Sequence, residues 1–525
     1  MRAEVVLYDT TLRDGMQGFG LQLTVDQKVR IARRLDALGV PYVEGGWPGA
    51  NPRDTAVFEA LARQPLARAR LAAFGATRRA NVAAAEDLGL AATLAAGTPV
   101  VTLVGKASRW QVEAVLRTTP AENLAMIGDS VAHAVGRGHE VIFDAEHFFD
   151  GFAHDPGYAL ATVERALTAG ARWVVLCDTN GGRLPAEVAR ATAAAAAPGP
   201  RQLGIHCHND IGLAVAASLA AVEAGAQMVQ GTINGCGERC GNADLLVVAA
   251  TLQLKMGRPV LPPERLSELV PVSRLLDTLL DRSPDPHRPY VGGAAFLHKA
   301  GLHAQGVARE AMAYQHLEPE RVGNRTRTVV SDLSGRASIA GKLRELGLGE
   351  LDPLTQGRLV ERLKALEVQG WAFEDADASF ELLVRRTLEG DVAPFALEGF
   401  TVLAHRDQVT VQATVKVRVG DAEVHTAADG NGPVAALDAA LRKALAAHFP
   451  VFGRVQLADY RVRVIDGDRG TGATVRVGID STDGQDHWTT VGCSSNILEA
   501  SALALTDSYE YAVRRDALNR SLQSA

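Results

Sequence analysis

The sequence contains few cysteines and no long apolar segments. Only five of its 525 residues are cysteines, an odd number spread through the chain, which excludes a disulfide framework and favours a reducing compartment. No apolar run reaches the length of about 20 residues that a membrane-spanning helix needs. The N-terminal segment MRAEVVLYDTTLRDG lacks the basic and apolar parts of a secretory signal. We therefore expect a cytoplasmic protein without a membrane partner.

An excess of basic charge is also absent. The chain has 54 Lys and Arg against 61 Asp and Glu, a formal net charge of -7, and its basic residues do not cluster. This balance argues against nucleic acid as the main partner. A chain of 525 residues is long enough for several domains and a large buried core.

Short apolar segments alternate with Ala- and Leu-rich helical stretches up to about residue 235. The eight segments are residues 4–8, 40–44, 71–74, 100–104, 140–143, 173–176, 203–206 and 227–230. Eight strands, each followed by a helix, predict an α/β fold of the (β/α)8 TIM-barrel class. An open, doubly wound sheet is the alternative, but the chain lacks the Gly-rich turn of a dinucleotide-binding fold.

Polar residues follow these predicted strands directly. In chain order they are Asp9, Arg13, Asp14, Gln17, Glu44, Lys106, Glu146, His147, Asp178, Thr179, Asn180, His206, His208, Asn234, Glu238, Arg239 and Asn242. Barrels carry their chemistry at the C-terminal ends of their strands. The pattern therefore predicts one active site built from the ends of most strands.

The stretch GIHCHNDIG, residues 204–212, indicates a metal site within this group. Alternation along a strand puts His206 and His208 on one face, where two imidazoles can bind one ion. A pair of hydrogen-bonded polar residues at a strand end is the alternative. Asp14 adds a carboxylate, and Asn242 can complete the set directly or through water. Without thiolate the set suits Zn, Mn, Mg or Co, and the sequence does not choose among them.

Such a metal has a clear chemical use. With vacant positions it can hold a 2-oxo acid through its keto and carboxylate oxygens and make the carbonyl carbon electrophilic. Arg13, next to the Asp14 ligand, is placed to stabilise oxyanion charge. A helix-capping or salt-bridging arginine is the alternative interpretation.

Two other features have weaker signals. Cys236 and Cys240, in CGERC, do not have a common zinc-ligand spacing, so we expect them to pack as small residues. Lys106 could form a Schiff base, but its surroundings favour a solvated lysine near a substrate carboxylate or phosphate.

Beyond the Pro-rich segment 259–263 the pattern changes. Residues 335–370 look helical, and alternating strands are expected from about Ala378. Residues 410–417 and 473–479 are each followed by a helix-like stretch, which predicts two strand–strand–helix units in an α+β domain with internal pseudo-symmetry. The expected domains are a catalytic barrel at 1–262, helical linker subdomains at 263–377 and a C-terminal regulatory domain at 378–525. Gly- or Ser-rich turns open both helices and suit an anion.

Three segments carry a family resemblance: DTTLRDGMQG at 9–18, HCHNDIGLA at 206–214 and GTINGCGERCGN at 231–242. They resemble the signatures of the DRE-TIM metallolyase superfamily. Within it the chain resembles the 2-isopropylmalate, homocitrate and citramalate synthases along nearly its full length. This resemblance implies a Claisen-type condensation of acetyl-CoA with a metal-bound 2-oxo acid, followed by hydrolysis of the CoA thioester.

The resemblance also implies roles for individual residues. The metal ligands are matched by Asp14, His206 and His208, with Asn242 beside them. Arg13 matches the arginine that activates the substrate and enolate oxygens, Glu146 matches the acidic residue assigned to acid–base work, and Thr179 matches the threonine that contacts the oxo-acid carboxylate. Gln17, which follows the first predicted strand, is also expected to bind substrate. His303 and Tyr314 resemble a His and a Tyr that reach over the barrel mouth, in the family from the partner subunit. An ordinary linker helix is the alternative for these two.

The branch within the family determines the substrate. The segments EGGWPGANPRD, FGATRR and FDAEHFFDG look most like the citramalate synthase branch, which uses pyruvate, whereas the leucine-pathway branch usually has an EAGFP-like motif. Trp47 would narrow the pocket toward a methyl group, although one methyl changes discrimination by only about 1 to 3 kcal/mol. A 2-isopropylmalate or homocitrate synthase is the nearest alternative. A lyase and a non-catalytic amino-acid sensor are more distant ones.

In the synthase family that the chain resembles, the C-terminal domain dimerises and binds the end product of the pathway between subunits. A homodimer is therefore expected. If the product is citramalate, the pathway leads toward isoleucine, which becomes the expected effector. A dimerisation domain that binds nothing is the alternative.

Overall fold

The computed structural model describes residues 4–523 except 198, 200–201, 299–302, 304–305, 308, 329–335, 391, 405–409 and 485. The chain divides into two compact units, which we describe separately. The first comprises Met1–Phe296 with Leu317–Arg325, and the second Leu297–His316 with Thr326–Ala525. Within the described residues, no helix is both long and apolar enough to cross a membrane.

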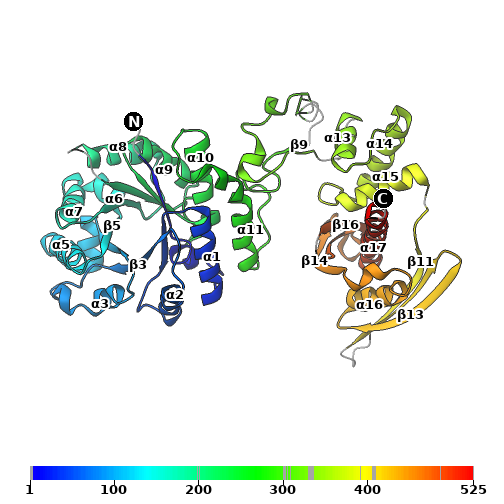
Figure 1. Cartoon of the computed structure of the whole chain (residues 1–525), viewed down its shortest axis with the longest axis horizontal. Helices are drawn as coiled ribbons and strands as arrows, with labels where there is room; N and C mark the ends of the chain where they lie inside the picture. The colour runs from blue at the N-terminus through cyan, green and yellow to red at the C-terminus, as the bar shows by residue number, and fades with distance from the viewer. Residues whose placement is uncertain are drawn as a thin grey trace. The chain divides into compact units, whose positions relative to one another are not determined.

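The first unit contains a closed barrel of parallel strands in sequence order (Figure 1). Its eight strands, all within the described residues, are β1 Val6–Asp9, β2 Tyr42–Gly46, β3 Arg70–Ala76, β4 Val100–Lys106, β5 Glu140–Glu146, β6 Trp173–Asp178, β7 Leu203–Cys207 and β8 Met228–Gly231. Pairing of β1 with β8 closes the ring. The predicted TIM barrel is confirmed, and each strand coincides with one of the predicted segments.

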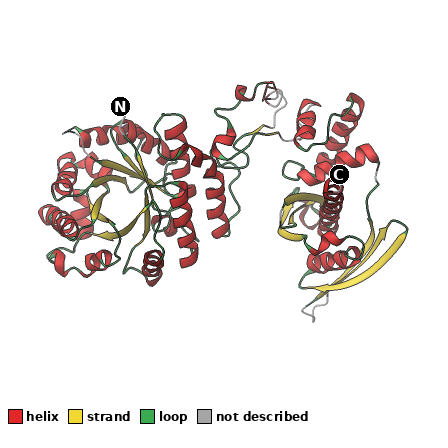
Figure 2. Ribbon diagram, in the orientation of Figure 1, coloured by secondary structure: helices red, strands yellow, loops and turns green. Residues whose placement is uncertain are grey.

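Helices surround the strands of the barrel, as Figure 2 shows by colour. The main ones are α1 Val25–Leu38, α2 Pro52–Arg63, α3 Leu88–Leu94, α5 Pro120–Gly136, α7 Pro156–Thr168, α8 Pro185–Ala196, α9 Ala214–Glu223 and α10 Leu245–Leu254. The ends of α1 follow from local chemistry. Thr24 and Gln27 form a reciprocal capping box, and Gly39 ends the helix at a φ of 96°, which a residue without a Cβ adopts most easily.

Strand alternation decides which side chains reach the barrel interior. In β5, Val141 and Phe143 pack in the apolar layer shared with the helices. Ile142 belongs to a separate buried cluster with inward residues of other strands. Asp144 and Glu146, two and four residues further on, line a cavity at the C-terminal end of the barrel. Because side chains alternate along the strand, the face of β5 that is buried in the barrel interior at Ile142 places the carboxyl groups of Asp144 and Glu146 in the cavity.

The helices predicted for residues 335–370 are found in the second unit as α13 Arg336–Glu345 and α14 Pro353–Val368. The expected start of the strands at about Ala378 is wrong, because Asp377–Glu389 forms another helix, α15. Its Phe380, Leu383 and Val384 are buried in the core that α13 and α14 also build. Their spacing of three and four residues is that of a helix.

The C-terminal repeat has more strands than predicted. Its first unit is β11 Ala396–Ala404, β12 Val411–Val419, β13 Ala422–Gly430 and α16 Pro433–Leu445; its second is β14 Gln456–Val464, β15 Val475–Thr482, β16 His487–Ser494 and α17 Ile497–Gln523. Each sheet is antiparallel and three-stranded. The pseudo-symmetric α+β domain is therefore present, but with three strands per unit. Most residues of β11 and β14 are exposed, and neither strand contains a fully buried residue.

Candidate metal and active site

One cavity of about 750 Å³ lies at the C-terminal ends of the barrel strands. It is lined by ten of the polar residues that follow the predicted strands: Arg13, Asp14, Gln17, Lys106, Glu146, Thr179, His206, His208, Glu238 and Arg239. They come from β4, β5, β7 and the loops that follow β1, β6, β7 and β8. The structure thus brings together side chains that are up to 226 positions apart, from Arg13 to Arg239. This convergence is what a barrel active site requires.

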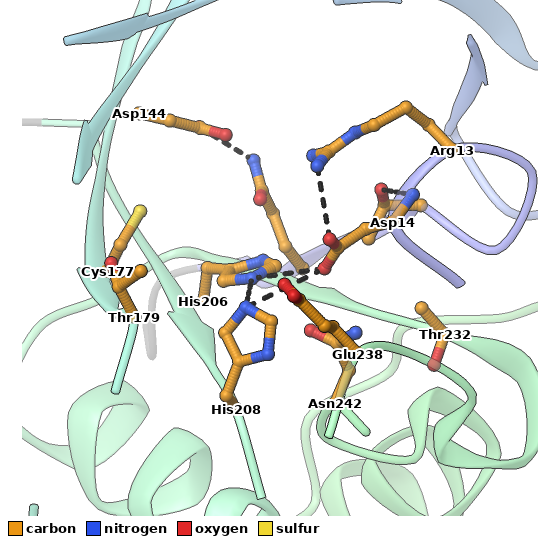
Figure 3. Close-up of polar contacts among 12 residues, drawn as sticks. Arg13, Asp14, Asp144, Cys177, Thr179, His206, His208, Thr232, Glu238 and Asn242 are labelled. Atoms are coloured by element: carbon orange, nitrogen blue, oxygen red, sulfur yellow. Dashed lines mark hydrogen bonds and ion pairs between the residues drawn. The ribbon is translucent and has the colours of Figure 1, made fainter. Parts of the chain in front are cut away.

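The two histidines and Asp14 form a compact buried cluster (Figure 3). The Nε2 atoms of His206 and His208 are 3.3 Å apart, and they lie 3.5 and 3.8 Å from Oδ2 of Asp14. His208 is one residue beyond the end of β7 and forms an isolated bridge with Asn242. Its ring nevertheless converges with that of His206, as the alternation of the sequence predicted.

The donor atoms of this cluster fit a divalent metal ion. Asp14 Oδ2 and Asn242 Oδ1 are buried, and neither has a hydrogen-bond partner among the described residues. Buried polar atoms almost always have a hydrogen-bond partner or another ligand, so a bound cation would satisfy these two oxygens. Burial lowers the pKa of His206 to about 3 and also lowers that of His208, which leaves neutral imidazoles that can bind a metal. Two imidazoles, a carboxylate and an amide oxygen suit Zn, Mn, Mg or Co.

Asp14 is ionised in this site. Burial alone would raise the pKa of its carboxyl, but the charged guanidinium of Arg13 opposes that effect and helps to bring the pKa below its ordinary value. The carboxylate is thus ready to act as a ligand at neutral pH.

The amide of Asn242 is held in one orientation. Its Nδ2 donates to the carbonyl oxygen of Cys236 at 3.1 Å, which leaves Oδ1 as the free acceptor. A Cβ on Gly237 would lie only 2.2 Å from this Nδ2, so the position requires glycine. Cys236 and Cys240 are both free thiols, and Cys236 is buried within this loop.

Arg13 is fixed by carboxylates on both sides. Its Nε donates to Glu44 at 2.7 Å and its Nη1 to Asp14 at 3.2 Å. The guanidinium carbon also lies 3.8 Å from the centre of the Phe74 ring. Burial opposes the charge, but Glu44 and Asp14 outweigh it and raise the pKa of Arg13 further, so the guanidinium is always charged. It is a rigid cation at the edge of the metal cluster.

Two acidic residues in the barrel interior were not assigned a role from the sequence. Glu44 is fully buried and accepts hydrogen bonds from Tyr8 at 2.6 Å, Thr10 at 2.5 Å and Arg13. Asp144 accepts from Gln230 Nε2 at 3.0 Å and lines the cavity. Burial, followed by the nearby Glu44, raises the pKa of Asp144 to about 8. Asp144 could have been found from the sequence, because it lies two residues before Glu146 and therefore on the same face of β5.

Glu146 and Thr179 face the cavity from neighbouring strands. Glu146 forms an ion pair with Lys106, whose Nζ lies 2.5 Å from Oε2. The Thr179 hydroxyl oxygen accepts from the backbone N–H of His147 at 2.8 Å, so its proton remains free to donate. Gln17 is exposed at the rim of the same cavity.

His303 and Tyr314 belong to the second unit. Their rings stack, with centroids 4.3 Å apart and planes at 25°. The structure therefore pairs these two side chains with each other. Their expected position over the barrel mouth stays a prediction.

Comparisons with known proteins agree with this architecture. The HMGL-like family matches residues 4–276, the homocitrate synthase post-HMGL domain-like family residues 290–370, and the LeuA allosteric (dimerisation) domain residues 374–513.

Similar proteins match along nearly their full length. An (R)-citramalate synthase from Synechocystis sp. is 48% identical over 97% of this chain and 96% of its own length. One from Aquifex aeolicus is 46% identical over 98% and 99%. A 2-isopropylmalate synthase from Solidesulfovibrio magneticus is 31% identical over 98% and 97%. The chain therefore belongs to the HMGL-like family and, within it, to the (R)-citramalate synthases.

Proposed function

We propose that this protein condenses acetyl-CoA with pyruvate and hydrolyses the thioester, giving (R)-citramalate and CoA. The observation that carries the proposal is the Asp14–His206–His208 cluster facing Arg13 and Glu146 across one cavity. The membership of the chain among (R)-citramalate synthases supports the same reaction.

Asp14, His206 and His208, with Asn242 as a further oxygen donor, would hold a divalent metal, which would supply Lewis-acid polarisation of the keto group. Arg13 stabilises the negative charge that develops on substrate oxygens, and its contact with Glu44 keeps it in place without reorganisation. The fixed guanidinium group of Arg13 is therefore suited to stabilise negative charge that develops on the substrate oxygens only in the transition state.

The remaining residues bind substrate or move protons. The Thr179 hydroxyl donates to the oxo-acid carboxylate, because its oxygen is already held by the backbone of His147. Gln17 contacts substrate at the rim of the cavity. Glu146 transfers protons during enolate formation and thioester hydrolysis. We assign further acid–base roles to His303 of the partner subunit and Tyr314 of the partner subunit, supported by the family resemblance.

We expect pyruvate to be preferred over 2-oxoisovalerate and 2-oxoglutarate by at least about tenfold in kcat/KM, the discrimination that one or two methyl groups provide. Trp47 and Phe74 both line the cavity and pack edge-to-face with ring centres 5.2 Å apart, which limits the room for a larger side chain. CoA release measured with each oxo acid tests this expectation. A preference for 2-oxoisovalerate would instead indicate the 2-isopropylmalate reaction, a second candidate that the 31% identical relative supports.

We also propose three domains: a catalytic barrel at 1–262, linker subdomains at 263–377 and a regulatory domain at 378–525. The ranges of the three family matches support this division. We assign the last domain to homodimer formation and isoleucine feedback. The five free thiols support a cytoplasmic location.

Isoleucine should bind the full-length protein and lower its activity through a coupling of about 1 to 3 kcal/mol. The turn before α16 has no side-chain cap, so its backbone N–H groups suit a carboxylate, whereas Asn496 Oδ1 already accepts from the N–H of Leu498 at the start of α17. The LeuA allosteric (dimerisation) domain matches this region. Isothermal titration with isoleucine, and with leucine as the comparison, measures the binding. If neither amino acid binds at millimolar concentration, the feedback role is refuted and the domain is assigned to dimerisation alone.

A further inference from the structure

Lys106 and Glu146 occupy the ends of adjacent strands. They are direct partners in the register of β4 and β5, and the N–H of Ala107 donates to the carbonyl oxygen of Glu146 at 2.8 Å. The carbonyl oxygen of Lys106 accepts from the buried amide of Asn123 at 2.9 Å. Both backbones are therefore fixed where the strands reach the cavity.

Their side chains form an ion pair inside the cavity. Nζ of Lys106 lies 2.5 Å from Oε2 of Glu146, and the two side chains are 17% and 27% exposed. Both residues line the same cavity as Arg13 and the metal cluster. Partial burial makes such a pair stronger than an ion pair on the open surface.

Lys106 engages one of the two carboxylate oxygens. The other, Oε1, has His147 Nε2 at 3.9 Å, which is longer than a hydrogen bond. One oxygen of Glu146 is thus anchored to a cation, while the other has room for a substrate or a water molecule.

We propose that Lys106 is a positioning residue for the proton transfer assigned to Glu146, an inference that rests on the proposed function. The ammonium group holds Oε2, so Oε1 is presented to the acetyl group. Oε1 accepts a proton from the methyl carbon, directly or through one water, and the C–H electron pair becomes the enolate. Lys106 keeps its own protons throughout. A charged lysine in an ion pair is not the neutral amine that attacks a carbonyl, which excludes the Schiff-base role.

Replacement of the ammonium group tests this inference. Lys106→Met should lower kcat for CoA release by about 10- to 100-fold, the scale on which misplacement of a reacting group acts. KM and the calorimetric affinity for pyruvate should change little. Lys106→Arg should restore most of kcat, and methylammonium should partly rescue Lys106→Ala, because both return a cation to Oε2. A purely structural contribution would not respond to an added amine.

Arg183→Met is the matched control. Arg183 pairs with Asp150 at the same 2.5 Å, with side chains 22% and 23% exposed, but neither residue is among those that line the cavity. This variant should keep the wild-type kcat, whereas loss of kcat in both variants would mean that Lys106 acts only through folding.

Three results would overturn the inference while the wild type remains active. They are unchanged kcat in Lys106→Met, a rise in the KM for pyruvate at constant kcat, and a pyruvate adduct on Lys106 trapped by borohydride. The second would make Lys106 a substrate-binding residue, and the third a Schiff-base nucleophile. A wild-type protein that releases no CoA with any 2-oxo acid would refute the proposed function itself.

Discussion

His208→Ala is expected to fold with its barrel intact but to bind little divalent metal and to lose nearly all CoA release. The substitution removes one of three ligand atoms that lie within 4.8 Å of one another and leaves Asp14 with a single imidazole. The loss in metal affinity should exceed about 100-fold, because even residues behind the ligands contribute 10- to 100-fold. Metal content by mass spectrometry, metal titration by calorimetry and circular dichroism together measure this result.

His139→Ala is the control for that experiment. His139 lies just before β5, and its Nδ1 is 2.9 Å from the carbonyl oxygen of Thr98, away from the metal cluster. This variant should keep its metal and its turnover. Full metal content and normal turnover in His208→Ala would show that the cluster is not the metal site.

Glu146→Gln is expected to lower kcat by about 10²- to 10⁴-fold, the contribution of a positioned acid–base group. Glutamine keeps the size of the side chain but cannot accept the proton. Binding of pyruvate should be largely preserved, since the metal cluster, Arg13 and Thr179 remain. Steady-state CoA release and calorimetric titration with pyruvate separate these two effects.

Glu140→Gln provides the comparison from the same strand. Glu140 begins β5 at the opposite end and pairs with Arg70 and Tyr42, so its substitution should not change kcat. A near-normal kcat in Glu146→Gln would show that Glu146 does not transfer protons in this reaction. The positioning role inferred for Lys106 would then be refuted as well.

The barrel was predictable because each strand is a short apolar segment and each is followed by polar residues. The same regularity predicts that Asp14, His206 and His208 lie at the C-terminal end of the barrel, where the structure has them. Their convergence to within 4.8 Å depends on the closure of the ring, which joins β1 to β8. A local pattern could indicate this contact but not its geometry.

The network behind Arg13 was not predictable in the same way. Glu44 looks like one more polar residue after a strand, yet it is fully buried and accepts from Tyr8, Thr10 and Arg13. The raised pKa of Asp144 likewise depends on burial and on Glu44, which is 100 positions away in the chain. Such properties arise from packing and cannot be read from spacing.

The missed strands have a different cause. β11 and β14 are largely exposed, so no buried face marks them, and the helix α15 lies before them where strands were expected. The better buried strands β12 and β15 alternate buried and more exposed residues, as expected.

We propose that this site joins acetyl-CoA to pyruvate with the help of a divalent metal. The most direct test incubates the full-length, metal-loaded protein with both substrates and quantifies CoA and citramalate, with chiral chromatography of the product. We expect CoA and (R)-citramalate in equal amounts, and loss of both when the metal is removed by chelation. CoA release that occurs only with a larger 2-oxo acid, or no product from pyruvate with metal bound, would contradict it.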